Sequence, residues 1–282
     1  MVKKVFEGLG LGLLICLSFI YTERAARVLI EKDEIMKEIH KHKKACELKP
    51  IDAIVNKDTI IPGINGYEVN ELGSYHKLKK VGFYNKELLE YKTIKPKNSL
   101  INNYNKYIIS GNLKKNGVSI LFKVEKDLKI DEILNILTKK GVVATFFIDS
   151  IWLENNNELV LSLIEEGHTI GNLSYNFDYQ HNDFIWIDTI IKKVGQQQQG
   201  YCYNEQEDKQ ALEICSINKN YTIRPSIIVK NYPTLEVKEK LKSGSIISFP
   251  INGIVINELN YIIDNIYSKG LKILPLSELL SE

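Results

Sequence analysis

The sequence has little excess charge of either sign and few cysteines. Its 282 residues carry a formal net charge of +2 at pH 7, which gives no support for binding to nucleic acid. None of the four cysteines forms a C-x-x-C pair or a zinc-finger spacing, so a zinc-finger module is not expected. The length leaves room for one sizeable core with additional segments.

The two cysteines of the C-terminal half, Cys202 and Cys215, leave two interpretations open. They form a disulfide if the domain lies in an oxidising compartment. Otherwise they are two buried free thiols, the simpler prediction, because the sequence does not fix the distance between them.

The sequence also lacks a full-length membrane-spanning run. The apolar stretch from Gly8 to Tyr21 follows Lys3 and Lys4, and it is shorter than the roughly 20 residues that a spanning helix prefers. No A-x-A-like cleavage site follows it, so an uncleaved signal anchor over residues 1–24 is favoured over a cleaved signal peptide. The positive-inside bias then predicts a single-pass protein of the cell membrane with its C-terminal part outside the cytoplasm.

Residues 25–49 are predicted to form a charged helical stalk with a partial apolar stripe. Such a stripe could pack against a second copy of the helix. Its members are Val28, Leu29, Ile35, Met36 and Ile39. The basic run from His40 to Lys44 is predicted to be a solvated face. Metal binding by His40 and His42 is the alternative, but side chains at helical positions i and i+2 diverge.

Residues 50–112 are predicted to form a small irregular module or an arm packed against the main domain. The segment Pro62–Gly66 carries strong turn chemistry, and short apolar stretches alternate with polar linkers.

From residue 117 to 282 the pattern becomes regular β/α. Strands are expected at 118–122, 142–148, 168–171, 201–203, 221–229, 245–249 and 271–274, with amphipathic helices between them. About seven βα units in this length are typical of a parallel, barrel-type α/β domain.

Three segments of this domain resemble the polysaccharide deacetylases, the NodB-type family (carbohydrate esterase family 4). They are Val142–Ile148, Gly167–Phe177 and Gly270–Leu280. The middle segment resembles the metal-binding stretch G-H-x-I-G-N-H-[ST]-x-x-H. The resemblance implies a distorted (β/α)7-type barrel with its site at the carboxyl ends of the strands.

The same resemblance implies metal-assisted amide hydrolysis, in which a divalent metal, commonly zinc, activates water. The chain departs from it at the functional positions. Lys123 stands at the base position and Val124 at the metal aspartate, Leu173 and Phe177 replace the two histidines, and Pro250 and Ile251 replace the acid motif; the arginine of the third motif is also missing near Cys202–Glu205. Hydrocarbon side chains offer no lone pair to a metal, so neither a metal nor another cofactor is expected.

Several polar or aromatic residues remain as candidates for a groove. They are Trp152, His168, Asn172, Ser174, Tyr175, Asp178 and His181. Trp152 could stack on a sugar or pack in the core. Asp178, His181 and Asp183, with Glu125 and Asp127, could form a relocated metal site.

These observations leave three functional hypotheses. The favoured one is a membrane-anchored pseudoenzyme of the cell envelope that binds cell-wall glycan or an envelope protein. The second is an active N-deacetylase with relocated ligands, and the third is a structural component of an envelope complex that uses the stalk and residues 50–112.

Overall fold

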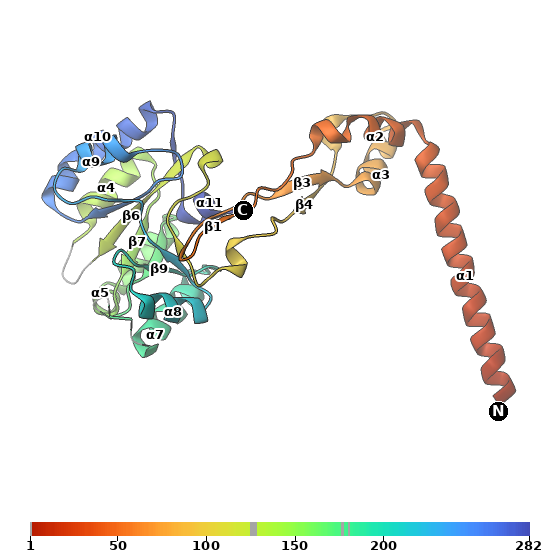
Figure 1. Cartoon of the computed structure of the whole chain (residues 1–282), viewed down its shortest axis with the longest axis horizontal. Coiled ribbons are helices and arrows are strands. Elements are labelled where there is room, and N and C mark those ends of the chain that lie inside the picture. Colours follow the sequence, from red (N-terminus) through yellow and green to blue (C-terminus); the bar gives the residue numbers. More distant parts are fainter. Residues whose placement is uncertain (1, 125–128, 176–177, 180) are drawn as a thin grey trace. The chain divides into compact units, whose positions relative to one another are not determined.

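The chain forms two compact units in this computed structural model (Figure 1). The structure describes residues 2–124, 129–175, 178–179 and 181–282, without the side chains of residues 2–16, 181 and 194. Unit 1 consists of Met1–Pro50 and Asn65–Ile94, and unit 2 of Ile51–Ile64 and Lys95–Glu282. The predicted module over residues 50–112 is therefore divided between the units, because its two ends add strands to the sheet of unit 2.

Unit 1 is a small helical unit with one antiparallel pair of strands. Its elements are α1 (Val2–Lys32), α2 (Glu34–Cys46), β3 (Gly66–Val69), α3 (Glu71–Val81) and β4 (Tyr91–Ile94). The Asp33 side chain caps α2 by accepting a hydrogen bond from the Ile35 N–H. Gly82 ends α3 in the left-handed conformation, with φ of 88°, which glycine adopts without a steric penalty.

The apolar stripe of α2 lies in the core of unit 1. Ile35, Met36 and Ile39 are buried in one cluster with Tyr75 and Leu78 of α3 and Val69 of β3. These three residues therefore pack within the chain itself and are not available for the self-association that a stalk would use. Val28 and Leu29, predicted on the same stripe, are exposed.

Among the residues that the structure describes, none of the helices combines the length and the apolar character needed to span a membrane. The N-terminal anchor remains a prediction from the sequence.

Unit 2 is an α/β domain around one curled sheet, as the sequence predicts. Eleven of the described strands form the sheet, in the order β1-β2-β5-β10-β9-β8-β7-β6-β12-β11, with β13 also pairing with β6. Their bounds are β1 (Ile54–Val55), β2 (Thr59–Ile61), β5 (Tyr107–Ile108), β6 (Gly117–Val124), β7 (Thr145–Ile148), β8 (Thr169–Asn172), β9 (Tyr201–Tyr203), β10 (Tyr221–Ile223), β11 (Ile227–Ile228), β12 (Ile246–Pro250) and β13 (Lys272–Ile273). The sheet is a half-barrel rather than a ring of seven equal βα units, since β1, β2 and β5 extend it at one edge.

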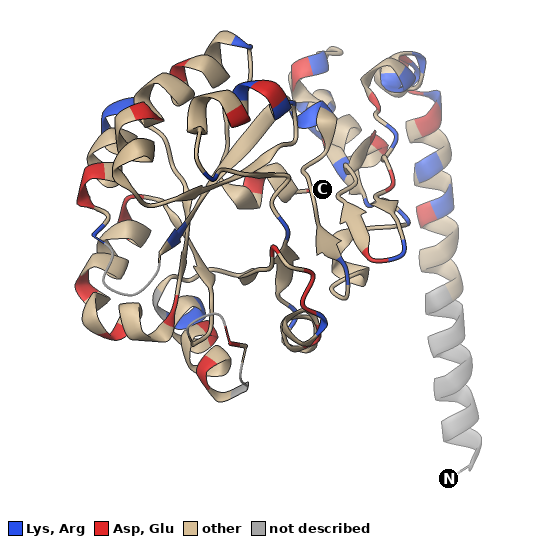
Figure 2. Ribbon diagram, turned by 60° about the vertical axis from the view of Figure 1, so that its left-hand side comes forward, with Lys and Arg blue, Asp and Glu red and all other residues tan. Residues whose placement is uncertain are grey.

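Helices cover the outside of the curl (Figure 2). They are α4 (Asp131–Lys140), α5 (Ser150–Asn155), α6 (Asn157–Glu165), α7 (His181–Val194), α8 (Lys209–Ile217), α9 (Pro233–Lys240) and α10 (Gly253–Ser268). The leucines of α11 (Leu276–Leu280) are instead buried on the inner side of the curl. All the predicted helices of this domain are present, and α5 is an additional one.

The segment predicted as one strand over residues 221–229 forms two strands with different partners. β10 pairs with β9 and β5, whereas β11 pairs with β12. Pro225 lies between them and has no backbone N–H to donate, so the ladder is interrupted there. Only residues 224–226 separate the two strands. They therefore connect β10, in the middle of the sheet order, to β11 at its end.

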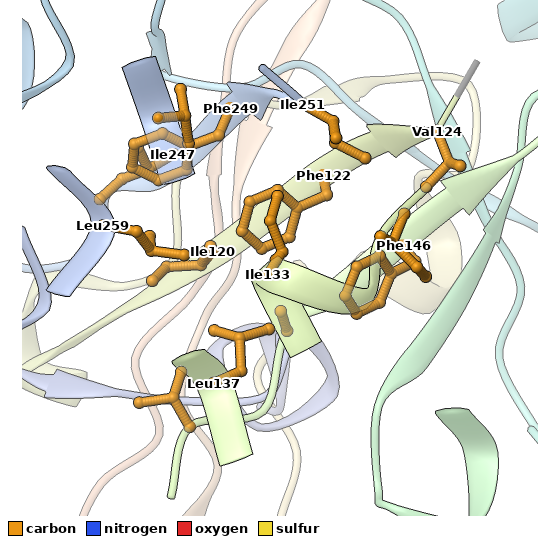
Figure 3. Packing of buried hydrophobic residues seen from close by; sticks show 14 of the residues in the cluster. Ile120, Phe122, Val124, Ile133, Leu137, Phe146, Ile247, Phe249, Ile251 and Leu259 are labelled. Atoms are coloured by element: carbon orange, nitrogen blue, oxygen red, sulfur yellow. The ribbon is translucent and has the colours of Figure 1, made fainter. Parts of the chain in front are cut away.

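Side chains of β6 alternate between two apolar layers. Ile120, Phe122 and Val124 face the outer layer, where they pack with Phe146 of β7 and with α4 and α10 (Figure 3). Leu121 faces the inner layer of the curl. This period of two places the next inward position, Lys123, at the carboxyl end of β6.

The inner layer is filled largely by hydrocarbon and aromatic rings. Leu173, which directly follows β8, is fully buried there together with Leu121, Phe147 and Tyr203. Full burial of a leucine side chain stabilises the fold by roughly 1.5–3 kcal/mol.

Cys202 and Cys215 form a disulfide that joins β9 to α8. Both are fully buried, in a cluster with Tyr179, Phe184 and Ala211. The simpler prediction of two free thiols is wrong in this structure, because strand and helix place the two Cα atoms 6.4 Å apart, within the range that a disulfide bridges.

We expect Leu173→Ala to lower the free energy of unfolding of unit 2 by about 2–5 kcal/mol, because it leaves a cavity in a packed layer. Leu161→Ala is the matched control, since Leu161 is 45% exposed; it should change the value by no more than about 0.5 kcal/mol. Both tryptophans of the chain, Trp152 and Trp186, lie in unit 2, so urea unfolding followed by tryptophan fluorescence reports this unit. Equal effects of the two variants would contradict a packed inner layer at Leu173.

Removal of the disulfide should also destabilise unit 2. The bridge closes a loop with a sequence separation of 13, for which the loss of the cross-link costs about 3 kcal/mol. Cys202→Ser with Cys215→Ser should show this loss in the same fluorescence experiment, and a reductant should leave the double variant unchanged. If the reductant does not alter the unfolding of the wild-type protein either, the bridge does not form.

Candidate functional site

A pocket lies at the carboxyl ends of β6 and β9. Its volume is about 280 Å³, and its lining residues are Lys123, Tyr179, Tyr203, Asn204, Glu205, Gln206, Asp208 and Ala211. Parallel strands present their carboxyl ends on the same side of a curled sheet. The pocket is therefore on the side where the sequence predicts the functional site.

Lys123 is the charged residue that β6 brings to this pocket. Its Nζ lies 3.9 Å from Oε1 of Glu205 and 5.8 Å from the centre of the Tyr203 ring. The two charged side chains are 23% and 30% exposed, so solvent reaches both. An ammonium group donates hydrogen bonds and has no lone pair, which makes Lys123 unsuitable as a base in its charged form.

Tyr203 links the ion pair to the next strand. Its Oη donates to Glu205 Oε2 at 2.9 Å and shares a hydrogen bond with Ser248 Oγ of β12, also at 2.9 Å. Its ring packs edge-on against Phe147. Burial raises the pKa of the Tyr203 phenol, so the group stays neutral at physiological pH.

Tyr179 fixes the floor of the pocket. Its Oη lies 2.9 Å from the carbonyl oxygens of Asn172 and Tyr203 and accepts the Tyr203 N–H at 3.0 Å. One phenol thus joins the ends of β8 and β9, and burial raises its pKa. Sequence reasoning missed Tyr179, Tyr203 and Glu205; the weak signal available was the loose match of Cys202–Glu205 to the third family motif.

The described residues at the expected metal positions do not form a metal site. Val124 is fully buried in the outer layer and Leu173 in the inner layer, and neither has a donor atom. Pro250 pairs with Lys123 at the end of β12, and Ile251 packs in the outer layer. Phe177 lies outside the described residues. The side chains described at these positions therefore do not fit zinc.

Asn172 and Ser174 form a turn after β8. Nδ2 of Asn172 donates to the Phe184 carbonyl at 2.9 Å, and Oδ1 accepts the Ser174 N–H at 2.7 Å. Ser174 has φ of 58°, a left-handed conformation that non-glycine residues seldom adopt. Both residues are buried, so their position favours a structural role over contact with a ligand.

Trp152 and His168 also lie away from the pocket. Trp152 is only 2% exposed and belongs to the outer layer, so it packs in the core and presents no ring face to a sugar. His168 precedes β8, at the amino end of the strand, where its Nδ1 accepts the Ala144 N–H at 3.0 Å. Burial lowers the pKa of His168, which keeps it neutral and available as this acceptor.

The segment proposed for a relocated metal site is only partly described. Tyr175 is 46% exposed and forms a short antiparallel bridge with Asp178. His181 begins α7, but its side chain lies outside the described residues. Within the described part of the chain, the one convergence of three candidate ligand atoms lies in unit 1. The relocated site stays a prediction.

Residues 110–237 match the family model of the polysaccharide deacetylases. The chain is also 36% identical over 151 residues to YlxY, an uncharacterised protein of Bacillus subtilis. That alignment covers 53% of this chain and 47% of YlxY, so it spans about half the length of this relative.

Solved structures similar to the chain share its fold. Wild-type BA3943 of Bacillus anthracis, a pseudoenzyme of carbohydrate esterase family 4, matches with a TM-score of 0.65 and 23% identity over 89% of this chain and 96% of that protein. A BA3943 mutant with restored enzymatic activity matches with a TM-score of 0.66. The peptidoglycan N-acetylglucosamine deacetylase Bc1960 matches with a TM-score of 0.55 and 21% identity, over 62% of this chain and 94% of that protein.

The family match, the curled sheet and these structural neighbours agree with one another. The matched region of unit 2 is a polysaccharide deacetylase domain of the NodB type, and unit 2 has the fold of carbohydrate esterase family 4.

Proposed function

We propose that the chain is a non-catalytic member of its family that binds cell-wall glycan in the pocket at the end of β6 and β9. The observation that carries the proposal is the Lys123–Glu205 ion pair at the position where the family places its base. The burial of Val124 and Leu173 in apolar layers supports it. Among structural neighbours, BA3943 is a pseudoenzyme of the same fold.

Hydrolysis of an acetamide at this site would need an activated water molecule and an acceptor for its proton. Family enzymes obtain the first from a metal, which lowers the pKa of its water to about 7. The described side chains here supply neither the ligand set nor the base, because Lys123 carries an ammonium group and Val124 and Leu173 carry hydrocarbon. The pocket can therefore bind a glycan, but it lacks the groups needed to hydrolyse its acetamide.

The pocket is suited to a small polar group. Its 280 Å³ is close to the lower limit of about 300 Å³ for small-molecule sites, which suggests one sugar unit rather than a long stretch of chain. Lys123 and Gln206 offer donors and Glu205 offers acceptors, the complement of hydroxyl and acetamido groups. Asn204 is already bound to the Asp208 backbone through both its amide nitrogen and its amide oxygen, so it shapes the rim.

The glycan is inferred from the family. Bc1960, a neighbour in fold, is a peptidoglycan N-acetylglucosamine deacetylase, and N-acetylglucosamine polymers are the corresponding ligand class for this chain. The Cys202–Cys215 disulfide supports an oxidising compartment outside the cytoplasm. The proposal also includes attachment to the membrane, which is based on the N-terminal apolar run.

We expect no acetate release from N-acetylglucosamine oligomers by the purified protein, with Zn²⁺ or Co²⁺ added, above the level of a heat-denatured control. The reason is the missing base and ligand set. A metal-dependent rate that is lost in His181→Ala or Asp178→Ala would instead support the relocated active site and contradict this proposal.

Binding of chitotetraose should depend on the pocket. Glu205→Gln removes the partner of Lys123 and the acceptor of Tyr203, and we expect it to weaken binding about tenfold, equivalent to about 1.4 kcal/mol. Glu213→Gln is the matched control, because Glu213 is an exposed residue of α8 with the same charge change. Titration calorimetry with both variants measures the difference. Absence of binding by the wild-type protein, or equal binding by both variants, would contradict a glycan site here and favour a protein partner.

A further inference from the structure

Three helices of unit 1 bring three potential ligand atoms together. His40 Nε2 of α2 lies 3.0 Å from Glu71 Oε2 of α3 and 3.7 Å from Glu31 Oε2 of α1. One ligand atom from each residue lies within 4.8 Å of the others. Zinc binds imidazole nitrogen and carboxylate oxygen at about 2.0–2.2 Å. Two ligand atoms on one ion are therefore farther from each other than from the ion, as the separations of 3.0 and 3.7 Å here are.

The neighbouring histidine of α2 is held in a different environment. His42 stacks on the Tyr84 ring, with centroids 5.2 Å apart, and its Nε2 lies 3.2 Å from Glu38 Oε2. The divergence of positions i and i+2 thus rules out a His40–His42 pair as the ligand set. His40 instead faces carboxylates on the two other helices, Glu31 of α1 and Glu71 of α3.

Glu71 uses its two carboxylate oxygens for different partners. Lys43 Nζ contacts Oε1, whereas His40 faces Oε2. The Lys43 ammonium, followed by His40, lowers the pKa of Glu71, so this carboxylate is ionised at neutral pH. The oxygen that faces His40 is not the one that Lys43 contacts, and an outer partner of this kind orients a metal-bound carboxylate.

The net charge around His40 is negative, which favours a bound cation. Glu31 and Glu71 supply two negative charges and Lys43 one positive charge around the His40 imidazole. The side chains of His40, Glu31 and Glu71 are 36%, 55% and 32% exposed. Water can therefore complete a coordination shell.

We propose that Glu31, His40 and Glu71 bind a divalent transition-metal ion, with Zn²⁺ as the expected occupant. One imidazole and two carboxylates form a mixed nitrogen and oxygen donor set that suits Zn²⁺ better than Mg²⁺ or Ca²⁺, which take oxygen ligands. The ion connects α1, α2 and α3 and so stabilises unit 1. This site is separate from the barrel and does not depend on glycan binding.

The test is a zinc titration of the full chain by calorimetry, together with thermal unfolding with and without Zn²⁺. We expect one Zn²⁺ per chain, a higher midpoint of unfolding with the metal, and a preference for Zn²⁺ over Mg²⁺. His40→Ala should weaken zinc binding by at least about tenfold, because even outer partners of a metal contribute this much. His42→Ala, on the same helix, should bind zinc as the wild type does.

The variants separate this site from one at the barrel. Zinc that is lost in His40→Ala belongs to unit 1, whereas zinc that persists in His40→Ala overturns this proposal and points to the barrel. Absence of zinc binding by the wild-type chain, or equal losses in His40→Ala and His42→Ala, would also overturn it. Circular dichroism of each variant without metal establishes that the helices are formed.

Discussion

The ion pair of Lys123 with Glu205 sets the chemistry available at the end of β6. A metal-dependent hydrolase needs a cation held by lone pairs and a base beside it. Here the positive charge is the Lys123 side chain itself, and its counter-ion is Glu205, in the segment after β9. The charge is partly exposed to solvent, so the pair contributes little to stability. In the function proposed here, its role is to offer hydrogen-bond donors and acceptors to a ligand.

The apolar layers occupy the positions beside the Lys123–Glu205 pair where the family places its metal ligands. Leu173 fills the inner layer, and Val124 packs against the helices in the outer layer. Tyr179 and the Cys202–Cys215 disulfide then hold the strand ends that shape the pocket. Packing, one buried phenol and one covalent link thus hold the strand ends around the pocket.

Much of unit 2 could be predicted from sequence because its signals are local. Val142–Ile148 is apolar except for Thr145, and the helices between strands show clear periodicity. The addition of β1, β2 and β5 could not be predicted, since strands of two or three residues carry no period and depend on a neighbour for their hydrogen bonds. The separation of residues 221–229 into two strands depends on partners far away in the sequence, although Pro225 was a usable sign.

The candidate site was predictable only in part. The family motifs identified Lys123 and Leu173 as substituted positions, and the structure places them in the pocket and the inner layer. The partner of Lys123 could not be found from spacing, because Glu205 reaches it across the curled sheet. Trp152 was ambiguous from the start, since an aromatic side chain after a strand suits a core as well as a groove. The same limit applied to His40, whose carboxylate partners lie on other helices.

The most direct measurement is anomalous X-ray diffraction at the zinc edge from crystals of the chain grown with zinc. The account predicts no zinc peak at the carboxyl ends of β6, β8 and β12, and a Lys123 ammonium group that faces Glu205. An ordered zinc ion there, coordinated by protein side chains, would contradict it.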